Sequence, residues 1–202
     1  MSGISDEEKV SSISVEEKER LLNDWKEYPM RSPKIAKVVV NMGVGRSGEL
    51  LERARNVLES LTDQIPINLI AKQTIRDFGI RKNEPISCKV TLRGEKARSF
   101  LEKAIVAVDN QLLLNSFDKF GNFSFGIKEH IDIPGTQYDP DLGIFGMDVC
   151  VALERPGYRI ARRRRQRYSV PMRHRLTKEE VRLFMEEEFG VEIVKERRMK
   201  FF

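Results

Sequence analysis

Apolar residues recur with helical spacing in four stretches of the chain. A short acidic helix is predicted over residues 14–28, because Ser14-Val15-Glu16-Glu17 forms a capping box and apolar positions follow at Leu21, Leu22, Trp25 and Tyr28. Two further amphipathic helices are predicted over residues 50–61 and 97–108. Thr177 opens a second capping box, and the helix that it predicts ends at Gly190.

Strands are predicted where β-branched residues cluster or where apolar and polar residues alternate. The predicted strands cover residues 35–42, 66–71, 86–92, 123–127 and 146–153. Between the second and third of them, residues 72–85 are polar and basic and predict an extended loop or hairpin. Helices and strands do not alternate regularly, so we predict an α+β fold. It is a two-layer domain with a mainly antiparallel sheet, helices packed on one of its faces, and a basic extension near the C-terminus.

This pattern divides the chain into four regions. Residues 1–28 form an acidic N-terminal extension with the short helix, and residues 29–154 form the α+β core. Residues 155–178 are a basic insertion, after which residues 179–202 supply a helix and a strand that complete the core. The core region is long enough to bury substantial apolar surface.

Charge is distributed unevenly along the 202 residues, whose formal net charge is +5. Residues 1–30 carry eight acidic and four basic side chains, whereas residues 155–178, here called the basic segment, carry ten Lys or Arg and no acid. Such a block repels itself unless an anion lies against it, and its excess of arginine favours phosphate contacts. Aromatic and turn residues interrupt it, unlike a disordered tail. Nucleic acid is the expected partner, and the central cations are Arg162, Arg163, Arg164, Arg165 and Arg167.

The composition excludes several classes of protein. Cys88 and Cys150 lie far apart with no Cys-x-x-Cys pair, which excludes a disulfide scaffold and a zinc ribbon. No apolar run approaches the roughly 18 residues that a membrane span needs, and the acidic N-terminus is not a signal peptide. We therefore expect a reduced, cytosolic compartment and no membrane partner.

A glycine-rich turn offers an alternative function. Gly43-x-Gly45-x-x-Gly48 follows a predicted strand and precedes a predicted helix, which is the spacing of a dinucleotide-binding turn. However, no acid ends the next strand to bind a ribose, and no further parallel strand–helix units follow. An ordinary tight turn is favoured, and a nucleotide-binding enzyme is the alternative. Free backbone N–H groups of the turn, at Gly43 and Gly45, can instead face a phosphate of a polynucleotide.

Candidate catalytic residues are few, so we expect no enzyme activity, no cofactor, no metal and no small-molecule substrate. His130 and His174 lie in no metal-binding spacing; we expect His130 at the surface or a sheet edge, and His174 in a polar contact. Cys88 alternates into an apolar strand face and is expected to be buried. An aromatic run is expected to belong to the core rather than to a base-stacking platform; it comprises Phe117, Phe120, Phe123 and Phe125.

Polar residues alternate with apolar ones along two of the predicted strands. Asn41, Lys89, Thr91 and Arg93 can therefore lie on one surface of the sheet. Amide and hydroxyl groups there would hydrogen-bond ribose 2′-hydroxyl groups and phosphate oxygens, and Arg93 offers a bidentate fork. No recognition helix is evident, so this surface suits the shallow minor groove of RNA better than the major groove of DNA.

Several longer strings of residues are similar to one family, and they occur in that family's order. They are KVVVNMGVG at 37–45, TIRDFGIRK at 74–82, CKVTLRG at 88–94, FDKFGNFSFGIKEHID at 117–132, GIFGMD at 143–148 and RPGYRIA at 155–161. From about residue 28 to residue 194, the chain resembles the family of large-subunit ribosomal protein five in its archaeal and eukaryotic form.

The resemblance implies a non-enzymatic cytoplasmic protein of the large ribosomal subunit, which binds 5S rRNA and helps to fix it in the central protuberance. It also implies contacts with large-subunit rRNA, with the P-site tRNA and with neighbouring ribosomal proteins, including a small-subunit bridge protein. The rRNA-binding residues expected from the sequence pattern and the resemblance together are Asn41, Gly43, Gly45, Gln64, Lys89, Thr91, Arg93, Arg159, Arg162, Arg163, Arg164, Arg165 and Arg167.

The resemblance further implies a tRNA-facing loop at residues 72–83. Its cations are Lys72, Arg76, Arg81 and Lys82. Asn83 stands where the family pattern leads us to expect glycine. Because asparagine tolerates a positive φ, the turn at this position is expected to survive.

Overall fold

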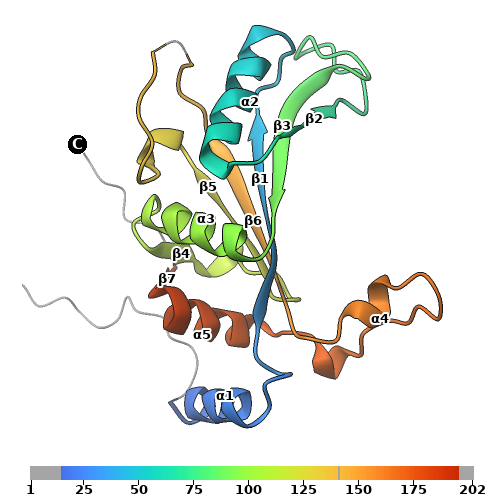
Figure 1. Cartoon of the computed structure of the whole chain (residues 1–202), viewed down its shortest axis with the longest axis vertical. Helices are drawn as coiled ribbons and strands as arrows, with labels where there is room; N and C mark the ends of the chain where they lie inside the picture. The colour runs from blue at the N-terminus through green and yellow to red at the C-terminus, as the bar shows by residue number, and fades with distance from the viewer. Residues whose placement is uncertain (1–14, 141, 196–202) are drawn as a thin grey trace, which may run out of the picture. The chain divides into compact units, whose positions relative to one another are not determined.

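The computed structural model describes residues 15–140 and 142–195, and its elements follow the hydrophobic pattern (Figure 1). The α-helices are α1 (Val15–Glu27), α2 (Glu49–Thr62), α3 (Glu95–Val106), α4 (Arg159–Arg162) and α5 (Lys178–Phe189). The strands are β1 (Lys34–Gly43), β2 (Ile67–Ile70), β3 (Pro85–Leu92), β4 (Gln111–Leu113), β5 (Asn122–Ile127), β6 (Met147–Glu154) and β7 (Glu192–Val194). Short 3-10 turns cover Leu114–Ser116, His130–Asp132 and Met172–His174. The helices and strands predicted within the described residues are confirmed to within a few residues.

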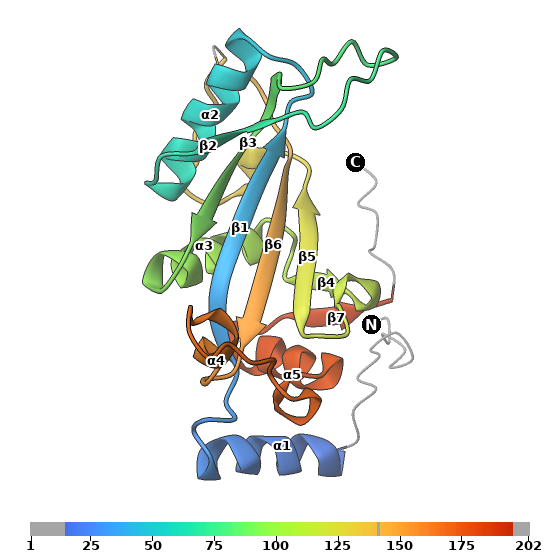
Figure 2. The same ribbon diagram turned by 90° about the vertical axis from the view of Figure 1, so that its right-hand side faces the viewer.

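A five-stranded sheet in the order β2-β3-β1-β6-β5 forms the framework of the fold (Figure 2). β1 and β3 pair antiparallel, with Val39 opposite Thr91 and Asn41 opposite Lys89. β2 adds antiparallel to the outer edge of β3, so that Ile67 lies opposite Lys89. Because neighbouring side chains on a strand point to opposite faces, this register sorts the sheet into one apolar and one polar surface.

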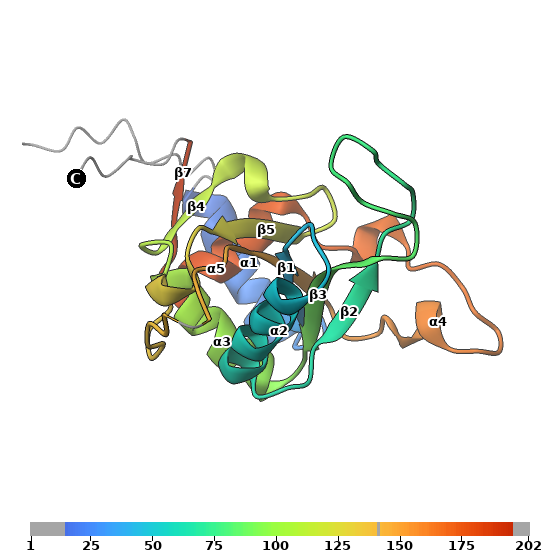
Figure 3. The same ribbon diagram turned by 90° about the horizontal axis from the view of Figure 1, so that it is seen from above.

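The amphipathic helices α2 and α3 lie on the same side of the sheet (Figures 1 and 3). They bury Leu51, Ala54, Val57 and Leu58 of α2 and Phe100, Leu101, Ala104 and Ile105 of α3. The strands contribute every second residue to this layer, namely Val38, Val40, Met42, Cys88, Val90 and Leu92. The predicted α+β class, with helices packed on one face of a mainly antiparallel sheet, is confirmed.

The chain clusters into two compact units. One comprises residues 37–108 and 124–150, with α2, α3 and the strand segments that they cover. The other comprises the described parts of residues 1–36, 109–123 and 151–202. In this second unit β4 and β7 form a parallel pair, with Leu112 opposite Ile193, and α5 contacts β7.

Helix α5 begins as its sequence predicts. Thr177 accepts a hydrogen bond from the Glu180 N–H at 3.4 Å, and the Glu180 carboxylate accepts one from the Thr177 N–H at 3.1 Å. The same carboxylate pairs with Arg155, and both side chains are buried. Gly190 ends the helix in the left-handed conformation, with φ +62°. One glutamate therefore caps α5 and neutralises a buried arginine at once.

A few predicted apolar positions are exposed instead. Leu50 and Tyr28 were expected on apolar helix faces, but they are 45% and 49% exposed. Phe117, Phe123 and Phe125 are buried as expected, whereas Phe120 lies on a turn and is 44% exposed. The predicted cap at Ser14 and the residues before it lie outside the described part of the chain, so α1 is described from Val15.

Candidate RNA-binding surfaces

The face of the sheet opposite α2 and α3 carries a polar strip on β1 and β3, as the sequence predicts. Asn41 and Lys89 are direct cross-strand neighbours, and Thr91 follows two residues further along β3. All three side chains are half-buried, whereas Arg93 is exposed just beyond the end of the strand. The strip is thus an amide, an ammonium and a hydroxyl on rigid backbone, which can contact phosphates and ribose hydroxyls.

The neighbours of the polar strip limit where an anionic partner can lie. Ser87 continues the strip on β3, and Val39 and Ile67 place apolar surface beside it. Ile67 is 65% exposed. On β6, which follows β1 in the sheet, Asp148 is exposed. That carboxylate repels phosphate. The charge pattern therefore favours the β2-β3-β1 part of the face as the place where an anionic partner such as RNA can lie.

Gln64 lies in the connection between α2 and β2 and is exposed. The pairing of β2 with β3, with Ile67 opposite Lys89, carries Gln64 toward the end of β3 where Thr91 and Arg93 lie. Asp63, immediately before it, ends α2 in a left-handed conformation with φ +48°. The register therefore makes Gln64 a candidate extension of the polar strip.

Two backbone donors of the glycine-rich turn after β1 are not free, contrary to what the sequence suggested. The N–H groups of Val44 and Gly45 both donate to the Ile86 carbonyl oxygen, at 3.1 and 2.9 Å. Gly45 has φ +76°, which explains the glycine by turn geometry. The expectation of a free phosphate-binding N–H group is therefore wrong for Gly45, because the Ile86 carbonyl oxygen of β3 accepts from it.

Residues 71–84 form a hairpin that leaves the sheet between β2 and β3 (Figure 3). Ile75 and Ile80 exchange backbone hydrogen bonds of 2.9 and 3.1 Å, and the Asn83 N–H donates to the Ala71 carbonyl at 2.9 Å. Asn83 has φ +68°, so the predicted tolerance of this turn for asparagine is confirmed. The hairpin is braced at its base, because both Ser47 and the Arg81 N–H donate to the Glu84 carboxylate. These donors hold the pKa of Glu84 below its usual value.

The hairpin presents cations and an aromatic ring together. Lys72, Arg76, Arg81 and Lys82 are all exposed. Phe78, which sequence reasoning did not single out, lies between them and is 74% exposed. An aromatic residue inside a basic loop was the signal that could have identified it, since exposed rings flanked by cations stack on RNA bases.

The basic segment is partly compensated by acids outside it. Arg155 pairs with Glu180, and Arg162 pairs with Glu154 at the end of β6. His174 makes the expected polar contact, with its Nε2 2.9 Å from the Pro156 carbonyl oxygen. Arg159, Arg163, Arg164, Arg165 and Arg167 are exposed on α4 and the loop after it. These exposed guanidinium groups are the ones placed to meet phosphates.

His130 was expected at the surface or at a sheet edge, and the surface position is wrong. Its side chain is buried at 3% exposure, in the 3-10 turn that follows β5. The Phe145 N–H donates to its Nδ1 at 3.3 Å, and the His130 N–H donates to the Phe145 carbonyl at 2.9 Å. Burial lowers the pKa of His130, and the two hydrogen bonds tie the turn after β5 to Phe145.

We expect His130 to make the protein less stable in mild acid. The pKa of His130 is lower in the folded state than in the unfolded chain, where it is about 6.5. The contribution of His130 to the free energy of unfolding is therefore fully present above about pH 6.5 and is lost as the pH falls toward the folded-state pKa. Urea unfolding at pH 7.5 and 5.5 measures this loss in the wild type, and His130→Gln should show a smaller fall. A variant whose unfolding free energy falls as steeply as the wild type's would disprove it.

Other side chains that could react or bind a metal have structural roles. Cys88 is fully buried, as predicted, and burial raises the pKa of its thiol. Among residues 15–140 and 142–195, no group of three His, Cys, Asp or Glu side chains is arranged to hold a metal ion. Within the same residues, no helix is both long and apolar enough to cross a membrane.

Comparison with known proteins identifies the family. The model described as "Ribosomal protein L5" matches residues 28–81, and a model of the C-terminus of the same ribosomal family matches residues 85–187. The chain belongs to the ribosomal protein L5 family. Its similar relatives include proteins named large ribosomal subunit protein uL5. The Aeropyrum pernix protein is 52% identical over 90% of this chain and 95% of its own length. The Sulfurisphaera tokodaii protein is 54% identical over 82% of this chain and 94% of its own length.

Membership of the ribosomal protein L5 family makes this chain a structural, RNA-binding protein of the cytoplasmic ribosome and not an enzyme. The fold agrees, because a dinucleotide-binding turn needs parallel neighbouring strands, whereas β1 pairs antiparallel with β3. In addition, Glu49 and Glu52 occupy the first turn of α2, where they oppose a bound phosphate. The nucleotide-binding alternative is therefore rejected.

Proposed function

We propose that this chain is a protein of the large ribosomal subunit that binds 5S rRNA through the polar strip of its sheet and helps to attach it in the central protuberance. The observation that carries this proposal is the cross-strand pair of Asn41 and Lys89, with Thr91 beside it, on the face that α2 and α3 leave uncovered. A rigid sheet holds these three groups in one plane before RNA arrives. Less side-chain and backbone entropy is then lost on binding.

The three groups of the strip have complementary tasks. The Lys89 ammonium neutralises a phosphate, which releases counterions and supplies affinity. The Asn41 amide and the Thr91 hydroxyl can donate to and accept from ribose 2′-hydroxyl groups, which distinguish RNA from DNA. This mixture suits the wide, shallow minor groove of an RNA helix. Gln64 and Arg93 extend the same surface at the end of β3.

Two further contacts belong to the proposal. The exposed arginines of the basic segment contact large-subunit rRNA, where they meet phosphates as bidentate forks. The hairpin of residues 71–84 faces the P-site tRNA with its cations and Phe78. Neighbouring ribosomal proteins, including a small-subunit bridge protein, are the expected protein partners.

Replacing either polar group of the strip should weaken 5S rRNA binding. We expect Asn41→Ala and Thr91→Ala to cost roughly 1–3 kcal/mol each, because a buried RNA group loses its partner. The measurement is the Kd for a 5S rRNA transcript at fixed salt. Asn56→Ala, an exposed amide on α2, is the matched control and should leave the Kd within about twofold. Near-neutral effects of both strip variants would move the interface to another surface.

A further inference from the structure

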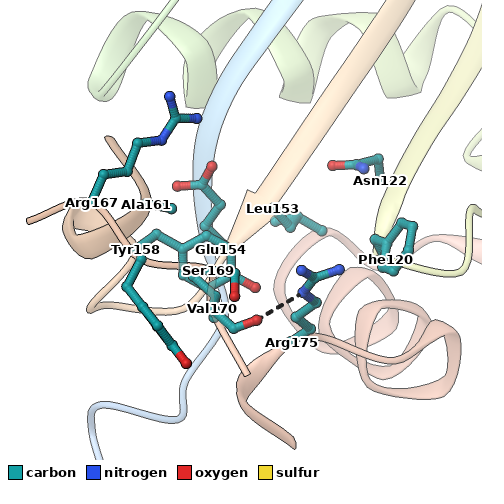
Figure 4. Close-up of a pocket in the computed structure, with 11 residues that line it drawn as sticks. Phe120, Asn122, Leu153, Glu154, Tyr158, Ala161, Arg167, Ser169, Val170 and Arg175 are labelled. Atoms are coloured by element: carbon teal, nitrogen blue, oxygen red, sulfur yellow. Dashed lines mark hydrogen bonds between the residues drawn. The ribbon is translucent and has the colours of Figure 1, made fainter. Parts of the chain in front are cut away.

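A pocket of about 630 Å³ lies within the unit that contains the basic segment (Figure 4). Phe120 and Asn122, from the turn into β5, line one side of it, and Glu154, at the end of β6, lines another. Arg167 and Arg175 of the basic segment also line it. Its volume falls in the range of pockets that hold small organic groups.

We propose that this pocket receives one unstacked nucleobase of an RNA strand whose phosphates lie along the basic segment. The proposal rests on the proposed rRNA contact of that segment and adds a specific site to it. Bases that leave their stack are held in proteins by aromatic rings and arginine planes, with polar groups at the base edge. The pocket supplies each of these parts.

The stacking surface is a fixed guanidinium group. The Arg175 guanidinium carbon lies 5.1 Å from the centroid of the Phe120 ring, and the Arg175 Nε–H donates to the Val170 carbonyl at 3.3 Å. The aromatic contact and the hydrogen bond together restrain the plane of the guanidinium. Phe120 is nevertheless 44% exposed, so this cation–aromatic pair is open to a ligand and not part of the core.

A glycine holds the aromatic side of the pocket in place. Gly121, between Phe120 and Asn122, is buried and has φ +79°. A Cβ atom at this position would lie 2.8 Å from the Leu176 Cβ and 2.8 Å from the Val181 Cγ2. The turn is therefore pressed against the start of α5, and only glycine fits there. This close contact fixes the positions from which Phe120 and Asn122 line the pocket.

The edge of the base would meet polar groups inside the pocket. Figure 4 shows the Asn122 amide and the Glu154 carboxylate on opposite sides of the open space. Asn122 is half-buried, and it lines the pocket. An amide both donates and accepts, so it can pair with the edge of any base. Arg162 holds the Glu154 carboxylate by an ion pair.

The charge around the pocket favours a polynucleotide as the source of the base. Arg163, Arg164 and Arg165 are exposed a few residues before Arg167, which lines the pocket, and no acid lies between residues 155 and 178. Phosphates held by these arginines would bring successive nucleotides to the pocket mouth. Tyr168, which also lines the pocket, is 69% exposed and offers a further ring to such a strand.

The test compares a single-stranded oligoribonucleotide with an abasic strand of equal length and charge, using the full chain. The wild type should bind the strand with bases about 5- to 150-fold more tightly, as expected for base stacking. Phe120→Leu combined with Arg175→Gln should remove most of this preference, and Asn122→Ala, which leaves the stack intact, should reduce it about threefold or more. The control is Tyr138→Leu, which removes an exposed ring in the other unit and should keep the preference for the strand with bases.

The outcomes separate this proposal from the proposed function. If both pocket variants keep the full preference for bases, the pocket does not hold a base, although the salt dependence of binding can still report arginine–phosphate contacts. If the wild type binds neither strand in a salt-dependent way, the rRNA contact of the basic segment is itself wrong. Retention of the wild-type circular dichroism spectrum shows that a variant is folded.

Discussion

Replacing Arg163, Arg164, Arg165 and Arg167 together with glutamine should flatten the salt dependence of binding to large-subunit rRNA. If each exposed guanidinium holds one phosphate, the slope of log K against log salt falls by roughly 3 units. Between 50 and 200 mM salt, the wild type would then lose roughly 50- to 150-fold more affinity than the variant. Filter binding of an rRNA transcript over a salt series measures both slopes.

The matched control keeps the charge and changes the shape of these four groups. Lysine at the same four positions should preserve most of the slope, because the number of neutralised phosphates is unchanged. It should still lower affinity at fixed salt, because lysine lacks the bidentate fork of arginine. If the glutamine variant has the wild-type slope, these arginines are not part of the RNA interface.

Loss of the Glu180 carboxylate should have the largest effect on stability. Glu180→Ala leaves the buried Arg155 guanidinium without its counter-charge and also removes half of the capping box of α5. Breaking a buried ion pair from one side costs about 3–5 kcal/mol, and the Arg155 Nε already lacks a hydrogen-bond partner. Urea unfolding, followed by circular dichroism, measures the free energy of unfolding.

Two variants separate the ion pair from the cap. Glu180→Gln can still accept from the Thr177 N–H, so its loss of stability reports the charge alone. Glu179→Ala removes the adjacent, exposed carboxylate and should change stability by no more than about 0.5 kcal/mol. A Glu180→Ala protein within about 1 kcal/mol of the wild type would show that Arg155 finds another partner or reaches water.

Local patterns predicted most of the helices and strands and much of the polar strip, but not β4 or α4. Alternation along 86–92 places Lys89 and Thr91 on one face, and the antiparallel register with β1 adds Asn41. The capping box at Thr177 and the positive φ at Asn83 follow from the chemistry of the residues concerned. These features depend on neighbours within a few residues or on the period of a strand, which the sequence displays directly.

Features that depend on distant partners could not be predicted. The buried His130 is hydrogen-bonded to the backbone of Phe145, fifteen residues away. The donors of the glycine-rich turn are satisfied by Ile86, which only the sheet register brings near. Similarly, the Phe120–Arg175 contact and the Arg155–Glu180 pair join segments far apart in the chain. A charge block thus gives a count of cations, but not which of them are already paired.

The most direct test of 5S rRNA binding by the polar strip compares two charge reversals. Lys89→Glu places a carboxylate beside Asn41 on the open face, whereas Lys103→Glu makes the same change of net charge on the exposed side of α3. In the Kd for a 5S rRNA transcript, we expect Lys89→Glu to weaken binding at least about tenfold and Lys103→Glu to stay within about twofold. Equal effects of the two reversals, or a wild-type protein that ignores the 5S transcript at low ionic strength, would contradict RNA binding by this face.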